Sequence, residues 1–167
     1  MVRRRVGMFR GPGAVRQRRK LVWATRNIDF GPVAAGATTN VDLLADFRAA
    51  GAFVIGCTIM RTHLGMHVQS TALTDSYEVG LVVGRLGDVA TNRISVNADP
   101  EIDWMYVNRW WAPASGAAVD AGEFHEIDLR AKRKLQELDQ AYLFVFTNQT
   151  AAAHTPHLFV RTLVALP

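Results

Sequence analysis

Apolar and polar residues alternate along much of the chain, in short runs separated by turn-forming residues. The longest run covers Ala52–Gln69. Up to Met60 its odd-numbered and even-numbered positions are both largely apolar, and from Arg61 onward polar residues alternate with apolar ones. A repeat of two residues is that of a β-strand, where successive side chains point to opposite faces of a sheet. We therefore expect one long strand over Ala52–Gln69, buried on both faces at its start.

Further runs of this kind fill most of the chain after Lys20. The strands they predict cover Leu21–Thr25, Ile28–Val33, Thr38–Leu43, Tyr77–Leu86, Ile102–Ala112, Phe124–Arg130, Ala141–Asn148 and Leu158–Leu166. Gly31 and Pro32 interrupt the second of these, and Gly80 and Gly84 mark a bend or bulge in Tyr77–Leu86. In the last strand the even-numbered positions are apolar apart from Thr162, whereas Arg161 interrupts the odd-numbered ones, so the even positions should face the core.

Helical signals are few. Asp42 can cap a short helix over Leu43–Ala50, which Gly51 would end from the position after its last turn. The segment 129–141 fits two structures, because Leu135 and Leu138 have helical spacing but the segment also follows a strand directly. It is either a helix or a strand end followed by a loop.

Eight or nine strands with one short helix predict an all-β fold, a sandwich or barrel. A doubly wound α/β fold is disfavoured because no long helices alternate with the strands. With 167 residues, of which 49% are hydrophobic, the chain can build one substantial core. We expect an Arg-rich N-terminal arm over residues 1–20 and a β-sandwich of jelly-roll type over residues 21–167.

The charge is divided unevenly along the chain. Nine of the 19 basic residues and none of the 15 acidic ones lie in residues 1–26, so the remainder carries ten basic residues and a net charge of −5. Such an arm repels itself and has little apolar surface, so it needs an anionic partner or a neighbouring subunit. Arginine pairs bidentately with phosphate, which favours nucleic acid bound through counterion release. The residues expected to bind it are Arg3, Arg4, Arg5, Arg10, Arg16, Arg18, Arg19 and Lys20.

Two other interpretations of the arm are a solvated tail and a nuclear-import signal. A membrane-surface helix is disfavoured because Gly11-Pro12-Gly13 would break it. No apolar stretch is long enough to span a bilayer, and no signal-peptide core follows the basic start. Cys57 is the only cysteine, so an intrachain disulfide is impossible and assembly inside a cell fits best.

The sequence carries no recognisable catalytic or cofactor-binding motif, so we expect no enzyme, no cofactor and no metal site. Cys57 lies in an apolar run, as a packed thiol does. His63 and His67 lie in a predicted strand, about 13 Å apart, and should be surface or interface residues. His154 and His157 are placed in a loop, and His125 has no nucleophile beside it.

An acidic cluster and an aromatic cluster each fit more than one role. Asp99, Glu101 and Asp103 could hold calcium at a subunit junction, form a solvated loop or pair with arginines such as Arg109. The tryptophans at positions 104, 110 and 111 suit a core and a subunit interface equally.

Three segments resemble the last strands of single jelly-roll coat proteins from small single-stranded DNA viruses and related small viruses or phages. They are Ile127–Leu135, Tyr142–Phe146 with Asn148, and Val160–Pro167. The arginine-rich start leading into Lys20-Leu21-Val22-Trp23 also resembles theirs. The resemblance implies an eight-stranded sandwich whose copies form an icosahedral shell around the viral genome, with the arms inside on the nucleic acid.

The leading hypothesis is therefore a capsid protein that self-assembles, binds the packaged genome through its arm and resides in the virion. The alternative is a nucleic-acid-binding protein that forms no shell, with a small OB-like β-barrel and a basic tail. A binding barrel should carry a basic groove interleaved with aromatic residues, whereas this body is net acidic. An enzyme on a β-sandwich scaffold would need clustered histidines and a carboxylate, but these histidines are scattered along the chain.

Overall fold

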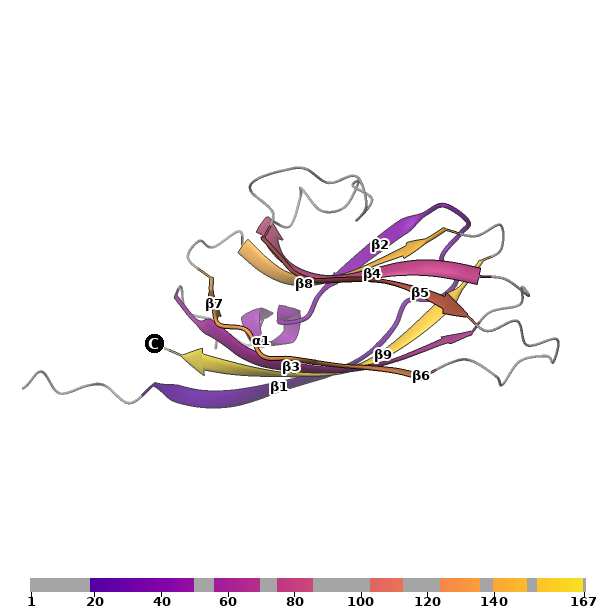
Figure 1. Cartoon of the computed structure of the whole chain (residues 1–167). Helices are drawn as coiled ribbons and strands as arrows, with labels where there is room; N and C mark the ends of the chain where they lie inside the picture. Colours follow the sequence, from indigo (N-terminus) through magenta and orange to yellow (C-terminus); the bar gives the residue numbers. More distant parts are fainter. Residues whose placement is uncertain are drawn as a thin grey trace, which may run out of the picture.

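Two antiparallel sheets pack face to face in the computed structural model (Figure 1), which describes residues 19–49, 56–69, 75–85, 103–112, 124–135, 140–149 and 153–166. The first sheet contains β1 (Lys20–Asp29), β3 (Thr58–Gln69), β6 (Phe124–Leu129), β7 (Arg133–Lys134) and β9 (Thr155–Leu166). The second contains β2 (Thr38–Asp42), β4 (Asp75–Arg85), β5 (Asp103–Ala112) and β8 (Gln140–Asn148). The helix α1 (Ala45–Ala49) follows β2.

The strand order is that of a jelly roll. It runs β1-β9-β3-β6 in the first sheet, with β7 paired to β3, and β2-β8-β4-β5 in the second. Early strands pair with late ones, β1 with β9, β2 with β8, β3 with β6 and β4 with β5. The chain thus forms one long antiparallel ribbon whose successive segments alternate between the two sheets. This confirms the predicted all-β jelly-roll sandwich.

The core lies between the sheets and is rich in aromatic residues. Tyr77, Tyr142, Phe144 and Phe146 are fully buried there, beside aliphatic side chains from both sheets. Burying one such side chain contributes about 1.5 to 3 kcal/mol relative to leaving it in water. A sandwich needs one buried face per sheet, and these residues supply it for the second sheet.

Strand β8 is buried on both of its faces. Every residue of Ala141–Asn148 is buried, although only alternate side chains can point between the sheets. The remaining ones form a second apolar cluster on the other side of the sheet, made of Val82, Ala141, Leu143 and Val145 with Trp104 packed against it. The second sheet therefore has an apolar layer on each side.

The C-terminal strand β9 is central to the first sheet because it pairs with both β1 and β3. Leu158, Val160, Thr162 and Val164 are at most 4% exposed, whereas Phe159 is 48% exposed. The prediction that the even-numbered positions face the core is thus confirmed.

Two bulges break the regular pairing of the strands that the structure describes. In β3 the register against β9 shifts between Ile59 and Arg61, which leaves Met60 as the extra residue. In the second sheet β4 pairs with β8 without interruption. The register between β4 and β5 shifts at Leu81 and Val82, and Met105 of β5 is the extra residue. A bend or bulge was predicted in Tyr77–Leu86, and the bulge that the structure shows there belongs to the neighbouring strand β5 and not to β4.

Several predicted boundaries were wrong at the N-terminal side of the sandwich. Leu21–Thr25 and the start of Ile28–Val33 form the single strand β1, because ten consecutive residues pair with β9. Strand β3 begins only at Thr58, because Gly56 forms a turn with a φ of +94°, a conformation that favours glycine. The residues 50–55 that precede this turn lie outside the described part of the chain.

The helix is shorter than predicted, and the ambiguous segment is not helical where it is described. Asp42 Oδ1 accepts a hydrogen bond of 2.9 Å from the Leu44 amide, as a capping residue does, but Leu43 and Leu44 form a turn before α1. After β6 the chain continues as a loop into β7 and the buried Leu135, which is the strand-and-loop alternative. Residues 136–139, including Leu138, lie outside the described ranges.

Candidate nucleic-acid interface

The predicted arm joins the sandwich at an edge of the first sheet. Lys20 is the first residue of β1, and among the described strands β1 pairs only with β9. Arg19 and Lys20 are both exposed. The other predicted nucleic-acid-binding residues, Arg3, Arg4, Arg5, Arg10, Arg16 and Arg18, lie outside the described residues.

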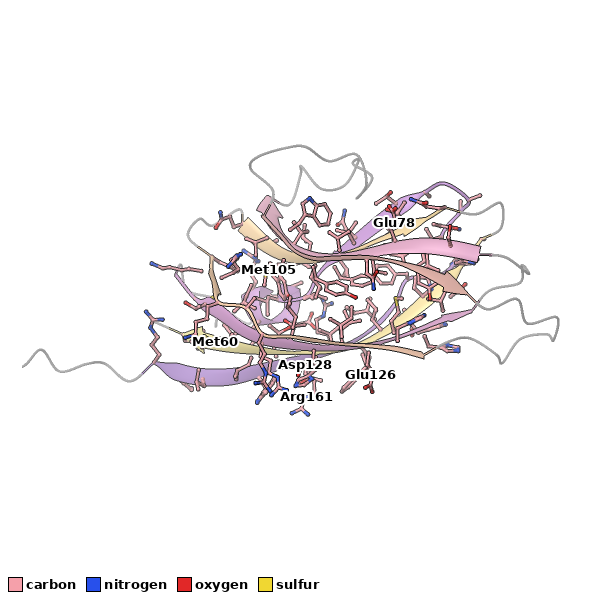
Figure 2. The ribbon with its side chains drawn as sticks, in the orientation of Figure 1. Met60, Glu78, Met105, Glu126, Asp128 and Arg161 are labelled. Atoms are coloured by element: carbon pink, nitrogen blue, oxygen red, sulfur yellow. The ribbon has the colours of Figure 1, made fainter. Side chains whose placement is uncertain are left out.

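The solvent side of the first sheet carries an unusual set of side chains, and we call this surface the outer face. It is formed by Leu21, Trp23, Thr25, Asn27, Asp29, Arg61, His63, Gly65, His67, Glu126, Asp128, His157, Phe159, Arg161 and Leu163. Figure 2 shows Glu126, Asp128 and Arg161 projecting from this sheet, away from the core. Leu21, Trp23 and Phe159 are 58%, 40% and 48% exposed, so large apolar groups are placed in water here.

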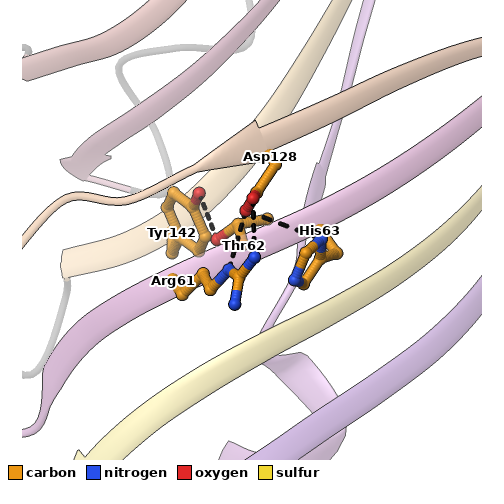
Figure 3. A network of polar contacts seen from close by, with 5 residues as sticks. All are labelled: Arg61, Thr62, His63, Asp128 and Tyr142. Atoms are coloured by element: carbon orange, nitrogen blue, oxygen red, sulfur yellow. Dashed lines mark hydrogen bonds and ion pairs between the residues drawn. The ribbon is translucent and has the colours of Figure 1, made fainter.

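One ion pair on the outer face is bidentate. The guanidinium of Arg61 donates to both carboxylate oxygens of Asp128, at 2.8 and 2.6 Å (Figure 3). These hydrogen bonds hold the pKa of Asp128 below its ordinary value and raise the pKa of Arg61. His63 Nδ1 lies 3.5 Å from the same carboxylate. The charges of Arg61 and Asp128 therefore largely cancel each other.

A second cation on this face lies against an aromatic ring. The guanidinium carbon of Arg161 is 5.0 Å from the ring centroid of Trp23, a cation–π contact across β9 and β1. The ring centroids of Trp23 and His63 are 6.1 Å apart. Within the described residues Arg161 forms no ion pair with a carboxylate. Its positive charge therefore stays available to an anion from solution.

The histidines are divided between the surface and the interior. His63 and His67 lie on the outer side of β3, as predicted. His157 belongs to β9, where it stacks on His67 at 6.3 Å and its Nδ1 lies 2.6 Å from Asp29 Oδ1. His154 is fully buried and forms an isolated bridge with Val33. The prediction that His154 and His157 lie in a loop was wrong, because backbone pairing extends across both.

The remaining titratable candidates have packing roles. The ring of His125 forms a 2.5 Å hydrogen bond with the hydroxyl of Tyr77, so it connects the two sheets. The thiol of Cys57 is fully buried, and burial raises its pKa to about 11. A thiol of this pKa stays protonated at neutral pH and is a poor nucleophile.

The acidic cluster and the tryptophans are described only in part. Asp99 and Glu101 lie outside the described residues, and of Asp103 only the backbone, at the start of β5, is described. Among the described residues no three His, Cys, Asp or Glu side chains are grouped as a metal site would require. Trp104 is half-buried on the outer side of the second sheet, and the side chains of Trp110 and Trp111 are not described. No described helix is long and apolar enough to cross a membrane.

Trp23, Phe159 and Arg161 were not predicted to lie together on one surface. They belong to the two ends of the chain, and only the pairing of β1 with β9 brings them to one surface. The sequence carries a partial signal, because the odd-numbered positions of the last strand contain both an aromatic residue and a charge.

The chain is similar in fold to several solved viral structures. No model of a known protein family and no curated protein matches it. A structure of Desmodium yellow mottle tymovirus is 9% identical with a TM-score of 0.48, over 100% of this chain and 92% of that one. A Nora virus structure is 12% identical with a TM-score of 0.43, over 99% and 65%. A 60-mer BFDV capsid protein is 13% identical with a TM-score of 0.39, over 90% and 97%.

Proposed function

We propose that this chain is a structural capsid protein, whose copies assemble inside a host cell into an icosahedral shell that becomes part of a virion. Residues 21–167 form the shell domain, and residues 1–20 form an arm that binds the packaged viral nucleic acid. The chain acts without a cofactor, and it is not an enzyme.

The observation that carries this proposal is a polycationic arm attached to the edge strand of a net-acidic jelly roll. The arm, residues 1–20, carries eight basic residues and no acidic ones, whereas the body, residues 21–167, carries 11 basic and 15 acidic residues, a net charge of −4. A body of this charge does not attract nucleic acid over its whole surface, so binding depends on the arm. A jelly roll with its own core can meanwhile pack against its copies through its sides.

The interior of the sandwich also supports a structural role. The described titratable groups between the sheets include Cys57, Tyr77, His125, Tyr142 and His154, and each is engaged in packing or in hydrogen bonds within the fold. An enzyme needs such groups in an accessible pocket with a matched pKa. The alternative of an OB-like barrel with a basic tail has less support, because the observed strand order is that of a sandwich.

Negative-stain electron microscopy of the purified full-length chain tests this proposal. We expect uniform closed shells that contain host or added nucleic acid, seen as a 260 nm absorbance that co-sediments with the shells. Particles that stay monomeric at high protein concentration, with and without nucleic acid, would refute the shell and favour the non-shell alternative.

A further inference from the structure

A groove of about 300 Å³ crosses the outer face of the first sheet at the middle of β3. Its floor is Gly65, which pairs with Phe159 of β9 on one side and with Glu126 of β6 on the other. Neighbouring strands are about 4.8 Å apart, so Phe159 and Glu126 face each other across about 10 Å. The missing side chain of Gly65 opens the space between them.

The glycine at this position is not needed by the backbone. The described glycines with a positive φ are Gly31, Gly36 and Gly56, and Gly65 is not among them. A glycine in the middle of a strand weakens it and often marks a place where a ligand comes close to the backbone. What the glycine at position 65 provides is therefore an open space above the strand, which a larger side chain would fill.

The two rims of the groove differ in chemistry. Phe159 is 48% exposed and presents a large apolar group beside the groove. Next to it Arg161, which also lines the groove, holds its guanidinium over Trp23. The opposite rim carries Glu126, an exposed carboxylate that forms no ion pair within the described residues. An apolar surface, a cation and a hydrogen-bond acceptor thus surround one opening.

We propose that this groove binds an unpaired base of single-stranded nucleic acid. The base stacks on Phe159, its exocyclic amino group donates a hydrogen bond to the Glu126 carboxylate, and a neighbouring phosphate lies near Arg161. Aromatic side chains interleaved with arginine on an exposed sheet are a common platform for single strands. A carboxylate repels phosphate, so Glu126 faces the base and not the backbone of the strand.

The position of the arm agrees with this site. Lys20 lies seven residues before Asn27, the β1 residue in register with Phe159, so the arm joins the sheet about 23 Å along the strand from the groove. The inference rests on the proposed function, because the arm would bring the strand to the groove. It adds a base preference that an arginine-rich arm does not have. Cytosine carries the amino group that Glu126 needs, whereas thymine does not.

Fluorescence anisotropy with the full-length chain and labelled oligo-dC or oligo-dT dodecamers tests the groove. A salt concentration of about 0.3 M weakens the phosphate contacts of the arm. We expect oligo-dC to bind at least about fivefold tighter than oligo-dT. Glu126→Ala should abolish this preference, and Phe159→Ala should weaken binding of both oligonucleotides by about tenfold. Gly65→Leu should act like Phe159→Ala by filling the groove.

Val107→Ala is the matched control, because Val107 is an apolar residue on the other sheet and is 50% exposed. This variant should bind both oligonucleotides as the parent chain does. Equal binding of the two oligonucleotides by the parent chain, or unchanged binding by both Phe159→Ala and Gly65→Leu, would overturn the inference. Loss of shells in Phe159→Ala with unchanged oligonucleotide binding would also overturn it and assign the outer face to a subunit contact. If the parent chain formed no shells but still preferred oligo-dC, the capsid proposal would be refuted and the base-binding groove would be supported.

Discussion

The hydroxyl of Tyr142 on β8 lies 2.8 Å from the hydroxyl of Thr62 on β3, in a hydrogen bond that connects the two sheets through the core (Figure 3). Both residues are at most 1% exposed. Burial raises the pKa of Tyr142 above its ordinary value, so the phenol stays neutral. The pair is therefore a neutral polar contact in an otherwise largely apolar interior.

Removing either hydroxyl of this pair should destabilise the sandwich. Thr62→Val leaves the Tyr142 hydroxyl buried without that partner, and Tyr142→Phe does the same to Thr62, at a cost of about 1 to 3 kcal/mol each. The double variant should lose less than the sum of the two single losses, because it leaves no stranded partner. Urea unfolding of the unassembled chain measures all three values. Strictly additive losses would show that the two hydroxyls do not interact.

Thr162 offers a matched control for Thr62. The two threonines are paired in register on β3 and β9, and both are buried. Among the described residues the Thr162 hydroxyl has no hydrogen-bond partner. Thr162→Val replaces an unsatisfied polar group by a methyl of similar size, so the free energy of unfolding should stay unchanged or rise. A loss as large as that of Thr62→Val would contradict this assignment.

Alkaline pH should weaken the fold through Cys57. Burial raises the pKa of this thiol from an ordinary value of 9.0 to about 11 in the folded chain. The unfolded state therefore loses its thiol proton first, so stability is constant below about pH 9 and falls as the pH rises toward 11. Cys57→Ala should remove this part of the decline.

The readout is the difference between parent and variant in the free energy of unfolding, measured from pH 7 to 11. Cys57→Ala should also cost about 1 kcal/mol at pH 7 through lost volume. The buried Tyr142 adds a decline of the same sign in both proteins, which cancels in the comparison. If the free energies of unfolding of the parent and of Cys57→Ala changed with pH in parallel, the buried thiol of Cys57 would not be the cause of the decline.

The C-terminal strand should be indispensable. Deleting residues 158–167 removes most of β9, which pairs with β1 on one side and β3 on the other. Both neighbours would lose their backbone partners, and the apolar side chains of the second sheet would lose their cover. We expect aggregated or unfolded protein, whereas deletion of Pro167 alone should have little effect. A soluble truncated chain with a cooperative unfolding transition would contradict the central role of β9.

The arm should be dispensable for folding but not for packaging. Deleting residues 1–18 removes six arginines and leaves all of β1 in place. The truncated chain should unfold with nearly the same urea midpoint as the parent, because the core is unchanged. Its nucleic-acid binding should weaken and become less dependent on salt, since fewer phosphates are neutralised. Unchanged affinity and salt dependence would refute the assignment of the arm.

Local pattern determined much of this protein. The alternation in Leu158–Leu166 identified the buried face of β9, because a strand turns successive side chains to opposite sides whatever its partners are. The clustering of arginines before Lys20 likewise needs no structure to be seen. Both features depend only on residues that are close together in the sequence, so they can be predicted without knowing the tertiary structure.

Tertiary pairing decided what depends on partners far away in the chain. The bulge at Met60 moves the buried positions of β3 from the odd to the even numbers, and it exists only in the register against β9. Thr62 and Thr162 are the same residue type on the same face, but only Thr62 meets the Tyr142 hydroxyl. Phe159, Gly65 and Glu126 form one row because three strands from distant parts of the chain align there. Register is set by the packing of the whole core, so no local pattern could have predicted these contacts.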